Sequence, residues 1–311
     1  TIQSIVPRDP SARRRLAAAG SALLLGTALA AAARAAVPPH DRTPRGPFAT
    51  AAMRAFLAAR GGEITAALYN VRSGRLFVYR PGVREDEASI AKVDILATLL
   101  HERGGPLASP DSGDAEAAID DSDNDAAQDL WQAAGGDPAI AAFNRAAGLT
   151  ETVLDPRGIW GHDETTAADQ IRLLRTLTSA NALLPATARR YELGLMRHVS
   201  STQAWGVSAG VLAPATVALK NGWLTPDNET GWQVNSIGAV RGRYRHYLIA
   251  VLTNSDPSMA YGVETIDGIS RMVWRYLLPR RFRPHAAAGS SFAKRETRST
   301  SSPTAPTGAR P

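Results

Sequence analysis

Residues 89–100 read SIAKVDILATLL, and this stretch decides how the rest of the chain is interpreted. Its apolar residues recur at spacings of three and four, which predicts a helix with one buried face. Ser89 and Lys92 stand three positions apart, so their side chains share one side of that helix. A serine hydroxyl becomes an effective nucleophile when a neighbouring base removes its proton, and Lys92 is placed to be that base. A Ser-x-x-Lys pattern alone is also common by chance.

Lysine is scarce in this chain, which otherwise uses arginine. Of the 35 Lys and Arg residues, three are lysine: Lys92, Lys220 and Lys294. Arginine stays protonated in proteins, whereas a buried lysine can lose its proton. We therefore expect Lys92 and Lys220 to transfer a proton or to occupy a tight anion site. The alternative is chance on a composition biased towards arginine.

Two further short motifs follow in chain order. Ser122-Asp123-Asn124 is expected to start a helix, and its simpler interpretation is an N-cap, which all three residue types favour. Lys220-Asn221-Gly222 is expected to end a strand, where lysine would hold a carboxylate and glycine would let a ligand approach the backbone. Its simpler interpretation is an exposed lysine near a turn.

Taken together and in this order, the three motifs form a specific pattern. The pattern resembles the serine β-lactamases and the penicillin-binding transpeptidases and carboxypeptidases, and most closely the class A β-lactamases. The run DSDNDAAQDLWQAAGGDPAIAAFNRAAGL at 121–149 is similar to the segment that follows Ser-Asp-Asn in that class. The resemblance covers about 47–278, nearly all of the chain that we expect to fold.

The resemblance implies a role for each motif residue. Ser89 would be acylated, Lys92 would be its base, and Ser122 would relay a proton to the leaving nitrogen. Lys220 would bind a substrate carboxylate and support Ser122, while Asn124 would hold a side-chain amide of the substrate. The implied catalytic residues are thus Ser89, Lys92, Ser122 and Lys220, and the implied substrate-binding residues are Asn124, Asn221, Gly222 and Trp223. The backbone N–H groups of Ser89 and Trp223 would form the oxyanion hole.

Three departures from the class A pattern stand out. Asn221 replaces the usual Thr or Ser of the third motif, and the stretch between Ser89 and Ser122 is short. The Glu-x-x-Leu-Asn of the Ω-loop, whose glutamate activates the deacylating water, is missing from PRGIWGHD at 156–163. The candidates nearby for that role are Glu151, Asp155, His162, Asp163 and Glu164. We therefore expect slow hydrolysis of the acyl-enzyme, or transfer of the acyl group to an amine.

The expected fold class is α/β (α+β), β-lactamase/transpeptidase-like, with an antiparallel sheet flanked by helices and an inserted all-helical lobe. Alternation of apolar and polar residues predicts a hairpin, and helical spacing predicts a first helix. Three later segments are candidate strands, and a closing helix follows them. An α/β lobe would combine 47–85 with 201–280, and the helical lobe would span 86–200. The predicted strands are 63–69, 75–79, 216–223, 232–239 and 247–253, and the predicted helices include 48–59, 89–100, one opened by Glu164-Thr165-Thr166, and 263–278.

The ends of the chain predict export. Arg13-Arg14-Arg15 precedes a weakly apolar run and an Ala-x-Ala site at 33–35, which is the layout of a signal peptide over 1–35 for the Sec or twin-arginine route. The alternative is a membrane anchor. We expect a linker over 36–46, a disordered tail over 281–311, and a secreted or cell-envelope location.

The composition limits the classes of partner that we expect. The net charge of +6 comes from scattered arginines and basic ends, which does not predict nucleic-acid binding. There is no cysteine, which excludes disulfides and thiolate chemistry, and we expect neither metal nor cofactor. We expect a monomer that has no membrane span after cleavage of the signal peptide. Its expected partner is a small β-lactam or a peptidoglycan-peptide-like molecule.

Three functions remain open from the sequence. The first is a β-lactamase-like hydrolase that opens an amide on Ser89. The second is a D-alanyl-D-alanine carboxypeptidase, transpeptidase or esterase on the same scaffold. The third is a non-catalytic envelope binding protein, which the joint presence of Ser89, Lys92, Ser122 and Lys220 argues against.

Overall fold

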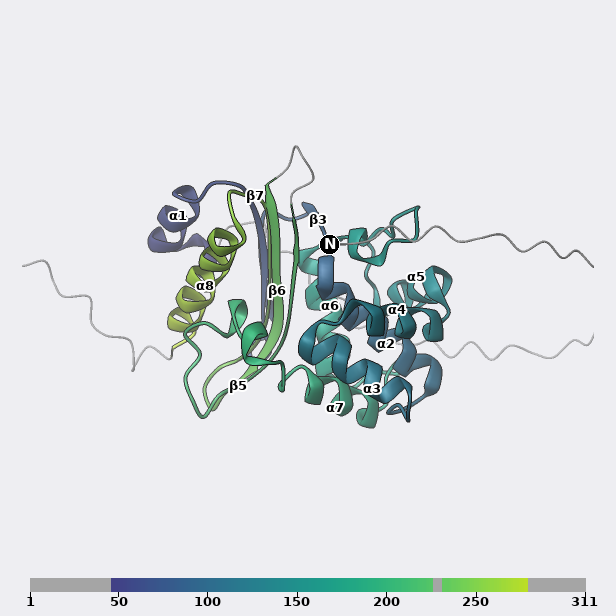
Figure 1. Cartoon of the computed structure of the whole chain (residues 1–311). Helices are drawn as coiled ribbons and strands as arrows, with labels where there is room; N and C mark the ends of the chain where they lie inside the picture. The colour runs from purple at the N-terminus through teal and green to yellow at the C-terminus, as the bar shows by residue number, and fades with distance from the viewer. Residues whose placement is uncertain (1–45, 226–230, 279–311) are drawn as a thin grey trace, which may run out of the picture. The chain divides into compact units, whose positions relative to one another are not determined.

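A five-stranded antiparallel sheet lies at the centre of the computed structural model, in the order β2-β1-β7-β6-β5 (Figure 1). The structure describes residues 46–225 and 231–278. The strands are β1 (Glu63–Asn70), β2 (Arg75–Tyr79), β5 (Thr216–Leu224), β6 (Trp232–Arg241) and β7 (His246–Asp256). This confirms the predicted hairpin and the three later strands. Because β1 pairs along its whole length with β7, segments from both ends of the described chain adjoin.

Two helices cover one face of the sheet, as Figure 1 shows. They are α1 (Ala51–Ala58), preceded by the short turn η1 (Pro47–Ala49), and α8 (Met259–Tyr276). Their apolar faces and the inward side chains of the strands form one core, which includes Met53, Leu57, Leu68, Ile249, Ile266 and Ile269. Each of these fully buried aliphatic side chains contributes about 1.5–3 kcal/mol through removal from water.

The helical part lies on the other face of the sheet (Figure 1). Its central helix is α2 (Ala91–Arg103), in which every residue from Ala91 to Leu100 is buried, so the apolar sequence of that segment is explained by enclosure on all sides. The surrounding helices are α3 (Asp111–Glu116), α4 (Asn124–Ala134), α5 (Gly136–Ala147), α6 (Ala167–Thr178) and α7 (Ala186–Leu195). Short helical turns complete it: η2 (Ala88–Ile90), η3 (Ala117–Asp121), η4 (Trp160–His162) and η5 (Ser201–Gln203). The turn η6 (Gly206–Ser208) instead packs against α8, on the opposite face of the sheet.

The structure corrects two element predictions. Glu164-Thr165-Thr166 does not open a helix but forms strand β4 (Glu164–Thr166), which pairs with β3 (Arg84–Asp86). The helix α6 begins directly afterwards, with the Thr166 hydroxyl accepting a hydrogen bond from Asp169 N at 3.1 Å. The helix predicted over 89–100 begins at Ala91, because Ala88–Ile90 form the turn η2, whereas the strand predicted over 216–223 extends one residue further, to Leu224. The region 86–200 is therefore helical except for this small two-stranded sheet.

Several predictions concern parts of the chain outside the described residues. They are the signal peptide over 1–35, the linker up to residue 45 and the tail over 281–311. In the part that the structure does describe, no helix combines the length and the apolar character needed to cross a membrane.

Candidate active site

Ser89 lies in the short turn η2, between strand β3 and helix α2, where it is half-buried. The residue before it, Ala88, has φ 52°, in the left-handed region that costs a residue with a Cβ roughly 1–2 kcal/mol. Such strain persists only where the surrounding structure imposes it, and it is often found at functional sites. The turn therefore holds Ser89 in one defined orientation at the start of the buried helix.

The Lys92 amine contacts four oxygen atoms. Its Nζ lies 3.2 Å from Ser89 Oγ, 3.1 Å from Ser122 Oγ, 2.6 Å from the Ser122 carbonyl oxygen and 2.7 Å from Asn124 Oδ1. The side chain is fully buried, and burial lowers the pKa of Lys92 to about 7, partly offset by the nearby Asp123 carboxylate. A neutral amine can donate two protons to the carbonyl oxygens and still direct its lone pair at a serine hydroxyl.

Lys220 reaches the same place from strand β5. Its Nζ donates to Ser122 Oγ at 2.9 Å and to the Asn221 carbonyl oxygen at 3.1 Å. Burial, together with repulsion from Lys92, lowers the pKa of Lys220 well below its ordinary value. Ser122, held at φ 63°, therefore stands between the two amines. Hydroxyl and amine groups thus form a continuous path from Ser89 through Lys92 and Ser122 to Lys220.

The motif at 122–124 starts helix α4, as predicted, and its three residues divide two tasks. Asp123 caps the helix by accepting a hydrogen bond from Ala126 N at 2.8 Å. Ser122 and Asn124 instead turn towards Lys92. The capping interpretation holds for Asp123, and Ser122 and Asn124 lie where the active-site interpretation places them.

Gly222 faces the nucleophile across the sheet edge. A Cβ at this position would stand 2.7 Å from Ser89 N and 2.9 Å from Ile90 N, which is too close for any side chain. Side chains alternate along a strand, so Lys220 and Gly222 face the turn η2 and Asn221 points to the other side. Glycine is therefore required here by the close approach of two backbones.

Asn221 requires a correction. Its amide is fully buried and donates to the Gln203 carbonyl oxygen at 2.7 Å and to that of Trp205 at 3.2 Å. We expected this side chain to contact a substrate carboxylate, but the enclosed amide holds the 203–205 segment instead. The Trp223 side chain packs beside Trp205, with 6.1 Å between the ring centroids, and its backbone N–H stays the predicted second oxyanion donor.

The segment expected to carry the deacylating base presents an indole to Lys92. The Trp160 ring centroid lies 5.3 Å from Lys92 Nζ, and its Nε1 donates to Gln128 Oε1 at 3.1 Å. In the part of the chain that the structure describes, no carboxylate makes a hydrogen bond or ion pair with Ser89 or Lys92. The sequence held no signal for this contact.

The acids considered for deacylation are occupied elsewhere. Asp155 pairs with Arg157 at 2.9 Å, and Asp163 accepts a hydrogen bond from Asp155 N at 2.7 Å. His162 contacts Asp86 through Nδ1 at 3.1 Å. Burial raises the pKa of Asp163 to about 7. Glu164 pairs through its backbone with Val153, in an isolated bridge that closes the base of this loop.

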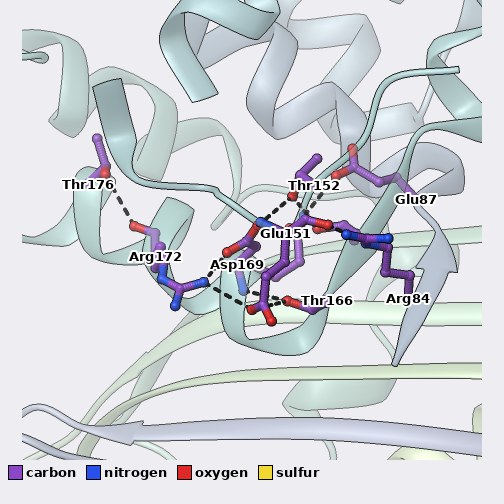
Figure 2. A network of polar contacts seen from close by, with 10 residues as sticks. Arg84, Glu87, Glu151, Thr152, Thr166, Asp169, Arg172 and Thr176 are labelled. Atoms are coloured by element: carbon purple, nitrogen blue, oxygen red, sulfur yellow. Dashed lines mark hydrogen bonds and ion pairs between the residues drawn. The ribbon is translucent and has the colours of Figure 1, made fainter. Parts of the chain in front are cut away.

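Figure 2 shows how the base of this loop is anchored to helix α6 and strand β3. The buried Asp169 accepts from Glu151 N at 2.7 Å and from the Thr152 hydroxyl at 2.9 Å, and it pairs with Arg172. Arg84 on β3 donates to the Glu151 carbonyl oxygen at 2.6 Å. The network ties strand β3, which leads into Ser89, to helix α6. No cluster of three potential metal ligands occurs among the described residues.

Comparison with known proteins bears on the fold and the family of this chain. A family model described as "Beta-lactamase enzyme family" matches residues 115–277. Among solved structures, an ancestral class A β-lactamase (GNCA) is 24% identical with a TM-score of 0.61, covering 72% of this chain and 97% of its own. A class A β-lactamase from Bacteroides cellulosilyticus is 18% identical with a TM-score of 0.65, covering 75% of this chain and 99% of its own.

Among curated proteins, the "Putative lipoprotein LppW" of Mycobacterium tuberculosis is 26% identical over 203 residues. The match covers 62% of this chain and 64% of that relative, so the chain spans about two thirds of the relative's length. The structural matches confirm the predicted class A β-lactamase fold, an antiparallel sheet flanked by helices. The family model extends over more than half of the chain. The chain therefore belongs to the β-lactamase enzyme family.

Proposed function

We propose that the protein is a serine hydrolase that forms an acyl-enzyme on Ser89 by opening an amide, with a β-lactam or a peptidoglycan-peptide-like molecule as substrate. The observation that carries the proposal is the 3.2 Å separation of Lys92 Nζ and Ser89 Oγ. A base within hydrogen-bond reach of the nucleophile, with its pKa near the working pH, is what nucleophilic catalysis by serine requires.

Acylation follows from the arrangement around Lys92. The neutral amine of Lys92 takes the proton of Ser89 Oγ, and Oγ attacks the substrate carbonyl carbon. The charge that develops on the carbonyl oxygen is stabilised by the backbone N–H groups of Ser89 and Trp223. The C–N bond then breaks, and the leaving nitrogen receives its proton from Ser122 Oγ. The Lys92 ammonium re-protonates Ser122, since the two groups are 3.1 Å apart.

Lys220 supports this path from the opposite side. Its Nζ is 2.9 Å from Ser122 Oγ, so a positive charge on Lys220 favours the anionic form of the serine during transfer. The low intrinsic pKa of Lys220 means that an anionic substrate group would raise its protonated fraction on binding. A substrate carboxylate near Lys220 is the form of substrate that fits this behaviour.

Release of the acyl group is slow in this proposal. Trp160 rather than a carboxylate faces Lys92 from the Ω-loop segment. A hydrolytic water then lacks its usual activating base, and transfer to an amine acceptor competes with hydrolysis. A carboxypeptidase, transpeptidase or esterase activity is the second candidate, favoured by the same observation. A binding protein without catalysis is the third.

A location in the cell envelope or outside the cell agrees with this substrate class. The expected signal over 1–35 supports export, and the curated relative carries the word lipoprotein in its name. Peptidoglycan-like peptides are reached from that side of the membrane.

The test is incubation of the protein with a fluorescent penicillin, followed by intact-mass analysis and a chase with unlabelled penicillin. We expect a covalent adduct that survives the chase, is absent from Ser89→Ala, and is retained in Ser73→Ala, a control at an exposed hairpin serine. Rapid turnover without a trapped adduct would support an efficient β-lactamase. An equal adduct on Ser89→Ala would exclude Ser89 as nucleophile, and no adduct on any variant would leave the esterase or the binding protein.

A further inference from the structure

A second cavity, of about 740 Å³, lies away from Ser89. It is bounded by the 210–215 loop before β5, the turn at 242–245 between β6 and β7, and the end of α8. The loop ends where β5 begins at Thr216, six residues before Gly222, which faces Ser89. At about 3.3 Å per residue, this places the cavity about 20 Å from the nucleophile along the strand. The volume is in the range of small-molecule binding sites.

Four arginines line this cavity: Arg243, Arg245, Arg271 and Arg275. Arg271 is neutralised by Asp267, with its Nη2 2.8 Å from Oδ2. For the other three, the described part of the chain provides no carboxylate partner. The lining therefore carries a marked excess of positive charge. A concentration of guanidinium groups around a cavity favours an anionic ligand.

Arg245 is the best-positioned of these arginines. Its Cζ lies 3.7 Å from the Trp274 ring centroid, so the guanidinium plane is fixed over the indole. Its Nε is buried and has no hydrogen-bond partner. A buried donor on a cation without a partner is costly, and the cost is removed when an oxyanion binds. Arg245 as a whole is only partly buried and lines the cavity, so its guanidinium can be reached by a ligand there.

The exposed rim of the cavity carries apolar side chains as well as arginines. Leu212, with 67% of its surface exposed, and Tyr244, with 38% exposed, are two of the four exposed large hydrophobic residues among those described. Both line the cavity, together with Pro214 and Trp274. Cationic and apolar groups lining one cavity are complementary to a molecule with an anionic head and an apolar body.

We propose that this cavity binds a phosphate-bearing amphiphile, with the phosphate against Arg245 and Arg275 and the apolar part against Leu212 and Tyr244. Several convergent arginines match the multiple oxygens and charges of a phosphate better than the single charge of a carboxylate. The sequence after Leu278 does not supply such a group, because residues 279–311 contain seven Lys and Arg and one Glu. The proposal is independent of the chemistry at Ser89.

The test measures binding to the full chain by isothermal titration calorimetry. The probe is dihexanoyl phosphatidic acid as a soluble monomer, compared with inorganic phosphate and with dihexanoyl phosphatidylcholine. We expect the phosphatidic acid to bind at least about tenfold more tightly than either, with affinity that falls as salt is added. Arg245→Gln and Arg275→Gln should each weaken binding about tenfold. The exposed control Arg190→Gln on α7, and Ser89→Ala, should bind as the unmodified protein does.

Each other outcome contradicts the proposal. Equal affinity for inorganic phosphate and phosphatidic acid would show that the apolar rim takes no part. Binding to phosphatidic-acid vesicles but not to the soluble monomer would indicate attraction to a membrane surface and not a cavity. Unchanged binding in Arg275→Gln, whose exposed side chain is not needed for folding, would exclude the assigned phosphate position even if Arg245→Gln were unstable.

Discussion

Lys92 ends among four oxygen atoms, and two of them are serine hydroxyls. An arginine at this position would keep the positive charge but could not give up a proton. We expect Lys92→Arg to lower the rate of acylation by a fluorescent penicillin by about 100-fold or more, the range attributed to general bases. Stopped-flow labelling measures the rate, and thermal unfolding checks that the variant folds. Labelling of a folded Lys92→Arg at the unmodified rate would contradict the role of Lys92 as base.

The same amine predicts how acylation depends on pH. Burial lowers the pKa of Lys92 to about 7, and the neutral form is the base. The acylation rate should therefore fall about tenfold for each pH unit below 7 and level off above about 8. Rates measured from pH 5 to 9 test this. A rate that stays constant across pH 6–8 would mean that another group removes the Ser89 proton.

At the residue scale, the sequence predicted which side chains meet but not how each one is used. The spacing of Ser89 and Lys92 on a helix was sufficient for the 3.2 Å contact, because the geometry is local. The orientation of Asn221 was not predictable, because it depends on where the 203–205 segment lies. The sequence also did not show which of Ser122, Asp123 and Asn124 caps the helix and which contact Lys92. That depends on the side on which each side chain leaves the start of α4.

At the scale of elements, strand β5 and turn η2 are in backbone contact at one point. A Cβ on Gly222 would stand 2.7 Å from Ser89 N. Gly222→Ala should therefore push the turn away from the strand, abolish acylation and lower the melting temperature. The matched control is Gly113→Ala in helix α3, where nothing lies within 4 Å of the added carbon. Acylation of Gly222→Ala at the unmodified rate would mean that the oxyanion donors do not depend on this contact.

The turn η4 offers a gain-of-function test. Its Trp160 ring lies 5.3 Å from Lys92 Nζ, on the segment that lacks a base. Trp160→Glu should place a carboxylate near the acylated serine, and we expect the adduct lifetime to shorten at least about tenfold, since one added general base contributes about 100-fold or more when well placed. Trp160→Gln, which opens the same space without a base, is the control. Equal shortening in both variants would indicate water access and not base catalysis.

Element prediction succeeded where the pattern was long and local. The strand over 63–69 was predicted from alternation and the one over 247–253 as a candidate strand, and the structure extends them only at their ends. The prediction that Glu164-Thr165-Thr166 opens a helix was wrong, because three residues are too few to show a helical or strand periodicity. They become a strand by pairing with Arg84–Asp86, which are about eighty positions earlier in the chain. Whether such a short segment becomes a helix or a strand is therefore decided by its non-local pairing.

On the scale of the whole molecule, the helical part encloses an unusual number of acids. Glu87, Asp94, Asp163, Asp169 and Glu192 are each at most 4% exposed. Burial raises the pKa of Asp94 and of Asp163 to about 7, and it raises those of Glu87 and Glu192 well above their ordinary values. Mutual repulsion adds to the effect, since Asp94 acts on both Glu87 and Glu192. The carboxyl groups of Glu87, Asp94, Asp163 and Glu192 are therefore largely protonated in the folded protein at mildly acidic pH.

The consequence is a molecule that is more stable in acid than at neutral pH. A carboxyl group with a raised pKa binds its proton more tightly when folded, so its contribution is complete below about pH 4 and is lost as the pH rises to about 7. The lowered pKa values of Lys92, about 7, and of Lys220 act in the opposite direction, and that of Lys92 does so from about pH 7 upwards. Between pH 5 and pH 7 the buried acids therefore set the direction of the change, and the lowered pKa of His246 acts against them.

Asp94 provides the sharpest test of this linkage. Its Oδ1 is buried without a hydrogen-bond partner, so ionisation there is costly, and each unit of pKa shift corresponds to about 1.4 kcal/mol. We expect urea unfolding to show a lower free energy of unfolding at pH 7.5 than at pH 5 for the unmodified protein. Asp94→Asn, which cannot ionise, should be about as stable as the unmodified protein at pH 5 and more stable by about 1–3 kcal/mol at pH 7.5. Equal effects of the substitution at both pH values would show that Asp94 acts through packing or hydrogen bonding and not through its proton.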